Sequence, residues 1–294
     1  MKQKIGWIGT GVMGKSMCSH IMKDGYNVSV YNRTKKKTED LIKMGATWRS
    51  NPEEVAENSD IIFTIVGYPK DVEEVYFGEK GIMEGIKPNS IIVDMTTSEP
   101  TLAQRIYQQA KKKQSFSIDA PVSGGDVGAR EGTLVIMAGG DKDVYEKILP
   151  FFNLMGKNVA YMGKTGAGQH TKMSNQILIA TTMIGVVESL LYAYKAGNDL
   201  GEVINVIGKG AAGCWSINNL GPRIVDGNFD PGFYIKHFIK DMGIALQEAK
   251  QMNLSLPGLA LAYQFYISAT AMGLENLGTQ GLYKVFVKMN GIEI

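Results

Sequence analysis

Short apolar runs alternate with longer amphipathic stretches through the first half of the chain. The runs lie at 5–8, 28–31, 61–66, 91–94, 116–120, 134–138 and 159–162. Strand-length runs separated by helix-length segments are typical of βαβ units, in which successive strands pair in parallel. The pattern therefore predicts a doubly wound α/β sheet.

The pattern changes after Gly168. Long stretches such as 172–196 and 238–252 lack strand-like alternation, and turn signals at 197–198, 221–222 and 256–258 separate them. This predicts an all-helical second half. Glycines 163, 166 and 168 interrupt any regular element just before it. We therefore expect a dinucleotide-binding domain at 1–163 and an all-α substrate and oligomerisation domain at 164–294.

Composition narrows the class of protein. The chain has 294 residues, of which 44% are hydrophobic and 20% charged, which excludes a disordered or collagen-like protein. Its 31 Lys and Arg nearly balance 29 Asp and Glu, so no strong positive field favours nucleic acid. The two cysteines, Cys18 and Cys214, lie far apart in the sequence. Such sparse cysteine usage is typical of a reducing compartment, and we expect a cytoplasmic protein.

Neither a signal peptide nor a membrane span is expected. The first residues lead straight into an apolar strand pattern, without the apolar core of a signal peptide. The longest uncharged run that could suggest a membrane span, 173–187, is 15 residues long and contains five polar side chains. Because a span needs about 18 or more mostly apolar residues, we interpret this run as a buried helix and expect no membrane partner.

A glycine-rich loop directly follows the first apolar run. Residues 9–14 form a Gly-x-Gly-x-x-Gly motif, and the stretch after them can be helical. The first glycine allows a tight turn, the second lets the backbone approach a pyrophosphate, and the third permits close helix–strand packing. The alternative is a plain turn between strand and helix. Because strand, loop and helix occur in this order, we expect a dinucleotide to bind along Gly9, Thr10, Gly11, Val12 and Met13.

The end of the second apolar run indicates which dinucleotide binds. NAD-binding proteins typically have an Asp or Glu there that holds the ribose 2′-hydroxyl. This chain has Asn32, Arg33 and Thr34 instead. Asn32 removes a charge that would repel a 2′-phosphate, and the Arg33 guanidinium can pair with one. We therefore expect NADP(H) to be preferred over NAD(H), the alternative being an ordinary exposed basic turn.

A serine and two glycines follow the fifth run, at the sheet edge where open α/β folds bind ligands. Consecutive N–H groups of Ser123, Gly124 and Gly125 can form an anion-holding concavity, and the serine hydroxyl adds a donor. We expect a small carboxylate substrate here. The alternative is a plain turn.

Lys172 opens the long predicted helix, with Asn175 and Gln176 three and four residues later on the same face. A lysine can protonate a developing alkoxide, and a neighbouring amide can hold the oxygen. The alternative is a lysine that merely extends its charged end into water at a helix start. The three histidines belong to no metal-binding pattern, and no Gly-x-Ser-x-Gly motif is present, so neither a metal site nor a hydrolase is expected.

Together these motifs make the chain similar, nearly end to end, to the β-hydroxyacid dehydrogenase family. The resemblance depends on segments 6–14, 94–97, 119–125 and 166–168, on Lys172 and Asn175, and on 240–241. The family includes 3-hydroxyisobutyrate dehydrogenases and glyoxylate or succinic semialdehyde reductases. The resemblance implies a Rossmann domain followed by an all-α domain, assembled as a homodimer or homotetramer.

The resemblance also implies roles for individual residues. Lys172 would be the catalytic acid/base, Ser123 and Gly124 would bind the substrate carboxylate, and Asn175 would support the reacting oxygen. An aromatic side chain near the substrate corresponds to Phe233. The nicotinamide side of the cofactor site would be lined by Val66, Gly67, Tyr68, Thr97 and Lys240.

The sequence thus predicts an NADP-dependent oxidoreductase of the 3-hydroxyacid dehydrogenase type, with Lys172 as general acid/base. Related 6-phosphogluconate dehydrogenases carry a histidine three residues after the lysine, where this chain has Asn175, which disfavours a sugar-phosphate reaction. Two alternatives stay open. One is a glyoxylate or succinic semialdehyde reductase within the same family, and the other is a non-catalytic NADP-binding scaffold protein.

Overall fold

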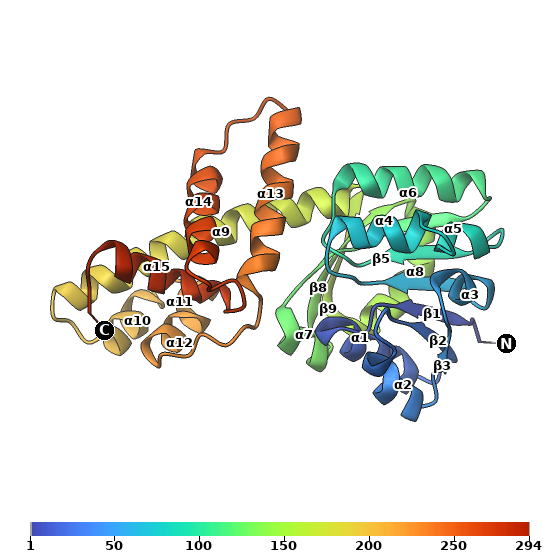
Figure 1. Cartoon of the computed structure of the whole chain (residues 1–294), viewed down its shortest axis with the longest axis horizontal. Coiled ribbons are helices and arrows are strands. Elements are labelled where there is room, and N and C mark those ends of the chain that lie inside the picture. The colour runs from blue at the N-terminus through green and yellow to red at the C-terminus, as the bar shows by residue number, and fades with distance from the viewer. Residues whose placement is uncertain (1, 294) are drawn as a thin grey trace. The chain divides into compact units, whose positions relative to one another are not determined.

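A computed structural model describes residues 2–293 of the chain and divides it into two compact units, Met1–Lys172 and Met173–Ile294. The first contains the sheet and the second is helical (Figure 1). The division falls inside a long helix, past the glycine-rich segment at 163–168. The predicted order of an α/β domain followed by an all-α domain is confirmed.

The sheet of the first unit contains nine strands among the described residues, in the order β3-β2-β1-β4-β5-β6-β8-β7, with β9 paired to β8. The strands are β1 (Ile5–Ile8), β2 (Val28–Tyr31), β3 (Thr47–Trp48), β4 (Ile61–Thr64), β5 (Ile91–Asp94), β6 (Phe116–Asp119), β7 (Val122–Ser123), β8 (Leu134–Gly140) and β9 (Gly156–Gly163). All seven predicted strands are present, whereas the two-residue strands β3 and β7 are too short to produce an apolar pattern.

Pairing departs from the prediction after β6. Strands β1 to β6 pair in parallel, but β8 runs antiparallel to both β6 and β7, and β9 runs parallel to β8. The expectation of parallel pairing throughout is therefore wrong. A parallel crossover needs a dozen or more residues, usually including a helix that returns the chain to the opposite edge. The connection from β6 to β8 is long enough for a crossover, but its helix α7 (Gly125–Glu131) has only seven residues, about 10 Å. Strand β8 therefore starts near the end of β7 and runs back antiparallel to both β6 and β7.

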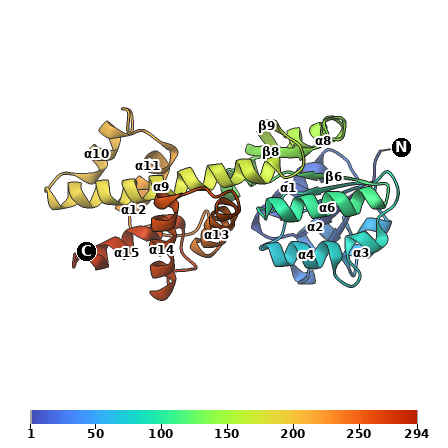
Figure 2. The ribbon, with the colours of Figure 1, turned by 90° about the horizontal axis from the view of Figure 1, so that it is seen from above.

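Helices cover both faces of the sheet (Figures 1 and 2). Alternate strand residues explain the two layers: Ile5 and Trp7 of β1 join one hydrophobic cluster, and Ile8 joins the other. The first face packs against α1 (Val12–Lys23), α2 (Glu39–Lys43), α7 and α8 (Lys142–Met155). The second packs against α3 (Pro52–Glu57), α4 (Pro69–Phe77), α5 (Ile82–Gly85) and α6 (Pro100–Lys112), and a short 3₁₀ turn, η1, spans Lys35–Thr38.

The second unit is built from helices around its own apolar core. Helix α9 (Ala167–Lys195) begins in the first unit and continues into the second, where Met183, Leu190, Phe238 and Tyr266 are among the buried core residues. The other elements are α10 (Leu200–Ile207), α11 (Trp215–Asn219), α12 (Gly221–Val225), α13 (Ile235–Gln251), α14 (Pro257–Ala271), η2 (Thr279–Gly281) and α15 (Leu282–Met289).

Helix α9 extends beyond the apolar run 173–187 at both ends. Its 29 residues include an 18-residue window with a mean hydropathy of 1.7, of which 39% is buried. By length and composition it could cross a membrane, but the core helix of a soluble protein meets the same test. Gln169, Lys172 and Gln176, all buried, place polar groups along this apolar helix.

Candidate active site

Two glycines of the predicted phosphate loop are required by the packing of the protein itself. Gly9 follows β1 with a φ of +96°, and a Cβ there would lie 2.0 Å from the carbonyl oxygen of Ile65. A Cβ on Gly14 would lie 2.1 Å from the carbonyl oxygen of Gly9. These distances leave no room for a methyl group, so the loop can form only with glycine at both positions.

Gly11 is different, because nothing in the protein requires it. Its φ of −69° suits any residue, and a Cβ there would have no atom within 4 Å. Gly11 is the N-cap of α1, and both Gly11 and Val12 are exposed, whereas Met13 packs partly against the core. Bare backbone and an accessible helix N-terminus together fit a bound pyrophosphate. The loop therefore has the shape that a dinucleotide needs.

Asn32 connects the glycine loop to the end of β2. Its Oδ1 accepts the Thr10 N–H at 3.0 Å, and its Nδ2 donates to the Thr34 carbonyl at 3.0 Å. An aspartate could accept the first bond but could not donate the second. In the sequence, Asn32 indicates only the absence of a repelling charge, and the structure adds a bridging role.

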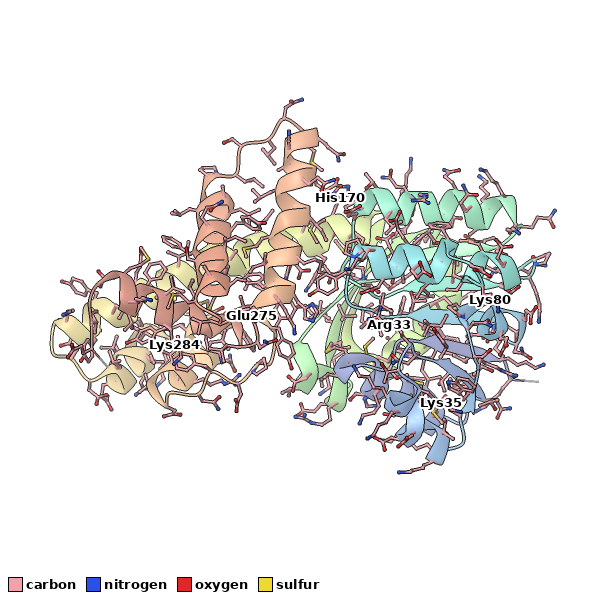
Figure 3. All side chains as sticks on the ribbon, in the orientation of Figure 1. Arg33, Lys35, Lys80, His170, Glu275 and Lys284 are labelled. Atoms are coloured by element: carbon pink, nitrogen blue, oxygen red, sulfur yellow. The ribbon has the colours of Figure 1, made fainter. Side chains whose placement is uncertain are left out.

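Arg33 is highly exposed and forms an ion pair with Asp71. The Arg33 Nη1 to Asp71 Oδ1 distance is 3.3 Å, and the Arg33 side chain is 86% exposed. Figure 3 labels Arg33 on the first unit. The other oxygen of Asp71 accepts the N–H of Tyr68 at 3.1 Å. Because β1 lies between β2 and β4 in the sheet, the pair joins the segments that follow these two strands, across the end of β1. No motif in the sequence indicates Asp71 as the partner of Arg33.

The predicted loop 66–68 is held by hydrogen bonds at the carboxyl ends of β4 and β5. The Val66 N–H donates to Thr96 Oγ1 at 3.0 Å, and the Thr96 N–H donates to Asp94 Oδ1 at 3.0 Å. Thr64 donates its hydroxyl to the same Asp94 oxygen at 2.9 Å. Thr97, which follows, is half-buried. The network is buried and fixes the backbone beside the predicted nicotinamide residues.

Ser123 is not part of a simple turn. It ends strand β7, where it pairs with Val135, and its side chain is half-buried. Gly124 and Gly125 follow with φ values of +128° and +63°, and helix α7 begins at Gly125. Positive φ at consecutive positions favours glycine. The predicted carboxylate-binding backbone is therefore a strand-to-helix junction at the expected edge of the sheet.

Lys172 lies near the start of α9 and is only 6% exposed. It shares a helix face with Gln169 and Gln176, three residues before it and four after it, which are also buried. Lysine is rarely buried unless its charge is compensated. The side chain is thus an integral part of a packed polar stripe, which contradicts the alternative of a lysine extended into water.

Asn175 begins a chain of polar contacts in the second unit. Its Nδ2 donates to Gln176 Oε1 at 2.6 Å, Gln176 Nε2 donates to Asp241 Oδ2 at 2.7 Å, and Lys240 Nζ lies 2.8 Å from Asp241 Oδ1. Asp241 is 1% exposed. Two residues with separate predicted roles, Asn175 and Lys240, are therefore linked through Gln176 and Asp241, whose linking role the sequence did not reveal.

Phe233 also lies in the second unit. Its ring centroid is 6.5 Å from that of His237 and 5.8 Å from that of Phe238, just before α13 begins. It is partly buried against the core. Its predicted place beside the substrate stays a prediction.

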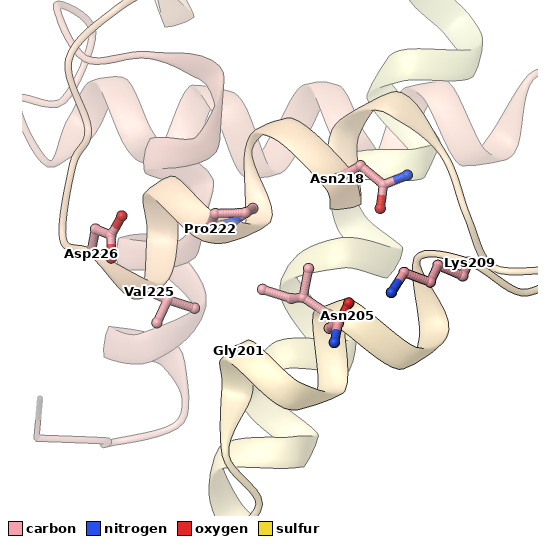
Figure 4. A pocket seen from close by; sticks show the side chains of 8 residues that line it. Gly201, Asn205, Lys209, Asn218, Pro222, Val225 and Asp226 are labelled. Atoms are coloured by element: carbon pink, nitrogen blue, oxygen red, sulfur yellow. The ribbon is translucent and has the colours of Figure 1, made fainter.

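None of the predicted residues lines the hollow formed by α10, α11 and α12 (Figure 4). This hollow has a volume of about 430 Å³ and is lined by Gly201, Ile204, Asn205, Lys209, Asn218, Pro222, Val225 and Asp226. Within residues 2–293, no group of three or more His, Cys, Asp or Glu side chains is placed to hold a metal ion.

Two family models match the chain. Residues 4–163 match the NAD-binding domain of 6-phosphogluconate dehydrogenase, and residues 166–286 match the NAD-binding model of NADP-dependent 3-hydroxyisobutyrate dehydrogenase. The two models meet at the glycine-rich segment between β9 and α9.

Similar proteins cover nearly the whole chain. A 3-hydroxyisobutyrate dehydrogenase-like protein of Arabidopsis thaliana is 53% identical over 99% of this chain and 87% of that protein. The 2-hydroxy-3-oxopropionate reductase of Escherichia coli is 37% identical over 97% of this chain and 98% of the reductase. The crystal structure of a 3-hydroxyisobutyrate dehydrogenase from Salmonella typhimurium superposes with a TM-score of 0.87 at 26% identity, over 97% of this chain and 100% of that one.

Proposed function

Because this chain belongs to the β-hydroxyacid dehydrogenase family and is an NAD(P)-dependent oxidoreductase, we propose that it transfers hydride between NADP(H) and a small 3-hydroxy acid or its semialdehyde. The observation that carries the proposal is the buried Lys172 near the start of α9. A buried amine is positioned and desolvated, which suits it to exchange a proton with a reacting oxygen.

In the proposed reduction, the residues of this chain bind the substrate and deliver the proton. The N–H groups at 123–125 and the Ser123 hydroxyl hold the carboxylate. A bound NADPH would supply the hydride for the aldehyde carbon. Lys172 Nζ gives a proton to the aldehyde oxygen, which becomes the hydroxyl. In oxidation the same amine takes the proton back. The Asn175 amide, one turn further along α9, donates a hydrogen bond to that oxygen and limits its build-up of charge.

The preference for NADP(H) rests on Arg33. Its guanidinium is exposed at the end of β2, with no acidic side chain at 32–34. The 2′-phosphate of NADP(H) is negatively charged, and the planar guanidinium can pair with it through two hydrogen bonds. The second family model is that of an NADP-dependent 3-hydroxyisobutyrate dehydrogenase, which supports a preference for NADP(H).

The E. coli relative acts, by its name, on 2-hydroxy-3-oxopropionate, so a semialdehyde reductase is the second candidate function. Glyoxylate and succinic semialdehyde are the other substrates of this class to test. A non-catalytic NADP-binding scaffold is the third alternative, and turnover of any of these substrates excludes it.

We also propose that the protein is a cytoplasmic homodimer or homotetramer. Both cysteines are free thiols, and Leu178 and Tyr192 on α9 are 68% and 79% exposed. Large exposed apolar side chains favour association. Light scattering after size-exclusion chromatography measures the number of copies.

The test of function is NADPH oxidation with a panel of small semialdehydes and keto acids that includes glyoxylate, 2-hydroxy-3-oxopropionate and succinic semialdehyde, repeated with Lys172→Ala. Loss of a general acid typically lowers the rate by about 10²–10⁴-fold, so we expect kcat to fall at least about 100-fold with unchanged NADPH affinity. Lys195→Ala, at the exposed end of the same helix, is the matched control and should keep full activity. A wild-type chain inactive on the whole panel would support the scaffold, and near-normal kcat in Lys172→Ala would remove this lysine from the acid's role.

A further inference from the structure

We propose that Asp119 is a positioning residue, because its carboxylate fixes the first turn of α9 on the sheet and thereby sets the place of Lys172. The inference rests on the proposed function, in which Lys172 exchanges the proton. It goes beyond that function by identifying which groups hold the lysine in place.

Asp119 is the last residue of β6 and is 2% exposed. Its Oδ1 accepts the Gly166 N–H at 2.7 Å, and its Oδ2 accepts the Gln169 N–H at 2.9 Å. The first N–H groups of a helix have no partner within the helix, and a negative charge there is favourable. Asp119 therefore caps α9 from a strand about 50 residues earlier in the chain, with both carboxylate oxygens in use.

Gln169 makes a second attachment at the same place. Its Nε2 donates to the Thr96 carbonyl at 2.7 Å, and its Oε1 accepts the Ser98 N–H at 3.0 Å. Its side chain is fully buried. Asp119 and Gln169 together attach the start of α9 to the ends of two neighbouring strands, β5 and β6.

The backbone at the start of α9 also lies too close to the sheet to move toward it. A Cβ on Gly168 would lie 2.3 Å from the Met137 carbonyl oxygen, and one on Gly139 would lie 2.7 Å from the Gly168 nitrogen. The helix start is thus packed against β8 without side chains between them. With the backbone blocked on this side, the Asp119 and Gln169 hydrogen bonds prevent movement away from it.

Lys172 follows Gln169 by three residues on the same face, about 4.5 Å further along the helix axis. Any shift or fraying of the first turn is therefore transmitted to the lysine. A displacement of about 1 Å at a catalytic group can lower the rate about 100-fold. This gives Asp119 an effect on kcat although it need not touch the substrate.

The test compares Asp119→Asn and Gln169→Ala with wild type. Asparagine keeps one acceptor oxygen but turns an NH₂ group toward an N–H donor, and Gln169→Ala removes both contacts to the segment after β5. We expect kcat to fall about 10- to 100-fold in each, with KM for NADPH changed less than twofold. NADPH titration counts the folded sites, so kcat is expressed per binding-competent molecule. Hydrogen exchange over 164–172 should become faster in both variants.

The matched control is Asp199→Asn. Asp199 caps α10 by accepting the Glu202 N–H at 2.8 Å, which is the same chemistry at a helix that carries no proposed catalytic residue. Its kcat should equal that of wild type. Full kcat per site in both Asp119→Asn and Gln169→Ala, with an active wild type, would overturn the positioning role alone. If Asp119→Asn does not fold, the kcat of Gln169→Ala decides whether attachment of the first turn of α9 to the sheet affects Lys172. Inactivity of wild type, or full activity of Lys172→Ala, would instead overturn the proposed function.

Discussion

Gly11 and Gly14 belong to one motif, but the structure predicts opposite consequences when each is replaced by alanine. In Gly11→Ala the new Cβ has no neighbour within 4 Å, and φ is −69°. Alanine is a poorer N-cap than glycine, by an amount within about 1 kcal/mol. A gain of about 0.4–1 kcal/mol from the restricted unfolded chain opposes this. We therefore expect Tm to change by no more than about 4 °C.

Cofactor binding should nevertheless be weakened in Gly11→Ala, because the methyl group would occupy the space in which a pyrophosphate approaches the backbone. Loss of one charge-assisted hydrogen bond costs about 1.5–3 kcal/mol. This corresponds to a rise in the Kd for NADPH of about 10- to 150-fold. NADH should be weakened equally, since both dinucleotides carry the pyrophosphate.

Gly14→Ala should instead lower the stability of the protein, with cofactor affinity affected only indirectly. Its Cβ would lie 2.1 Å from the Gly9 carbonyl oxygen and 2.8 Å from Ile65 Cγ2, so the backbone of α1 would have to shift. Overpacking of this kind typically costs about 1–3 kcal/mol of unfolding free energy. We expect the Tm of this variant to fall clearly, with any loss of NADPH binding secondary to the shift.

Nucleotide fluorescence titration and thermal unfolding of the two variants test the whole account of the loop. Wild-type NADPH affinity in Gly11→Ala would refute the pyrophosphate site at the start of α1. A large stability loss in Gly11→Ala, or none in Gly14→Ala, would refute the packing argument that separates the two glycines.

The remaining predictions concern charged side chains. Arg33→Ala should raise the Kd for NADPH about 10- to 150-fold and leave that for NADH nearly unchanged, and equal losses in a titration would make Arg33 structural. Asp71→Asn should strengthen NADPH binding about two- to fivefold by freeing the guanidinium, an effect that should vanish in an Arg33→Ala background. Burial raises the pKa of Asp119 from 3.8 to about 6, so the native state binds more protons than the unfolded state between these values. Stability relative to Asp119→Asn should therefore fall by up to about 3 kcal/mol as pH rises from 4 through 6, as chemical denaturation can measure, and a flat difference would contradict the shift. Asp241→Asn should lower kcat at least about tenfold, because it weakens the contacts of both Gln176 and Lys240. Unchanged steady-state kinetics would show that these polar contacts only stabilise the fold.

The sequence by itself determined the features that depend on neighbouring residues. Apolar runs of strand length indicated the seven principal strands, because a strand covered by helices on both faces needs apolar side chains in succession. Gly9 and Gly14 were recognisable because the strand, turn and helix that require them are adjacent in the chain. Arg33 was recognisable for the same reason, as it directly follows β2.

Tertiary structure decided whatever joins segments that are distant in the sequence. The antiparallel course of β8, the cap that Asp119 gives to α9, the ion pair of Arg33 with Asp71, and the contact of Gln176 with Asp241 each depend on where two separate elements meet. A carboxylate in a sequence carries no sign of which N–H or cation it will face, because its partner is set by packing of the whole sheet or helix layer. The residue types of the candidate site were therefore visible in the sequence, and the contacts that hold them in place became visible only in the folded chain.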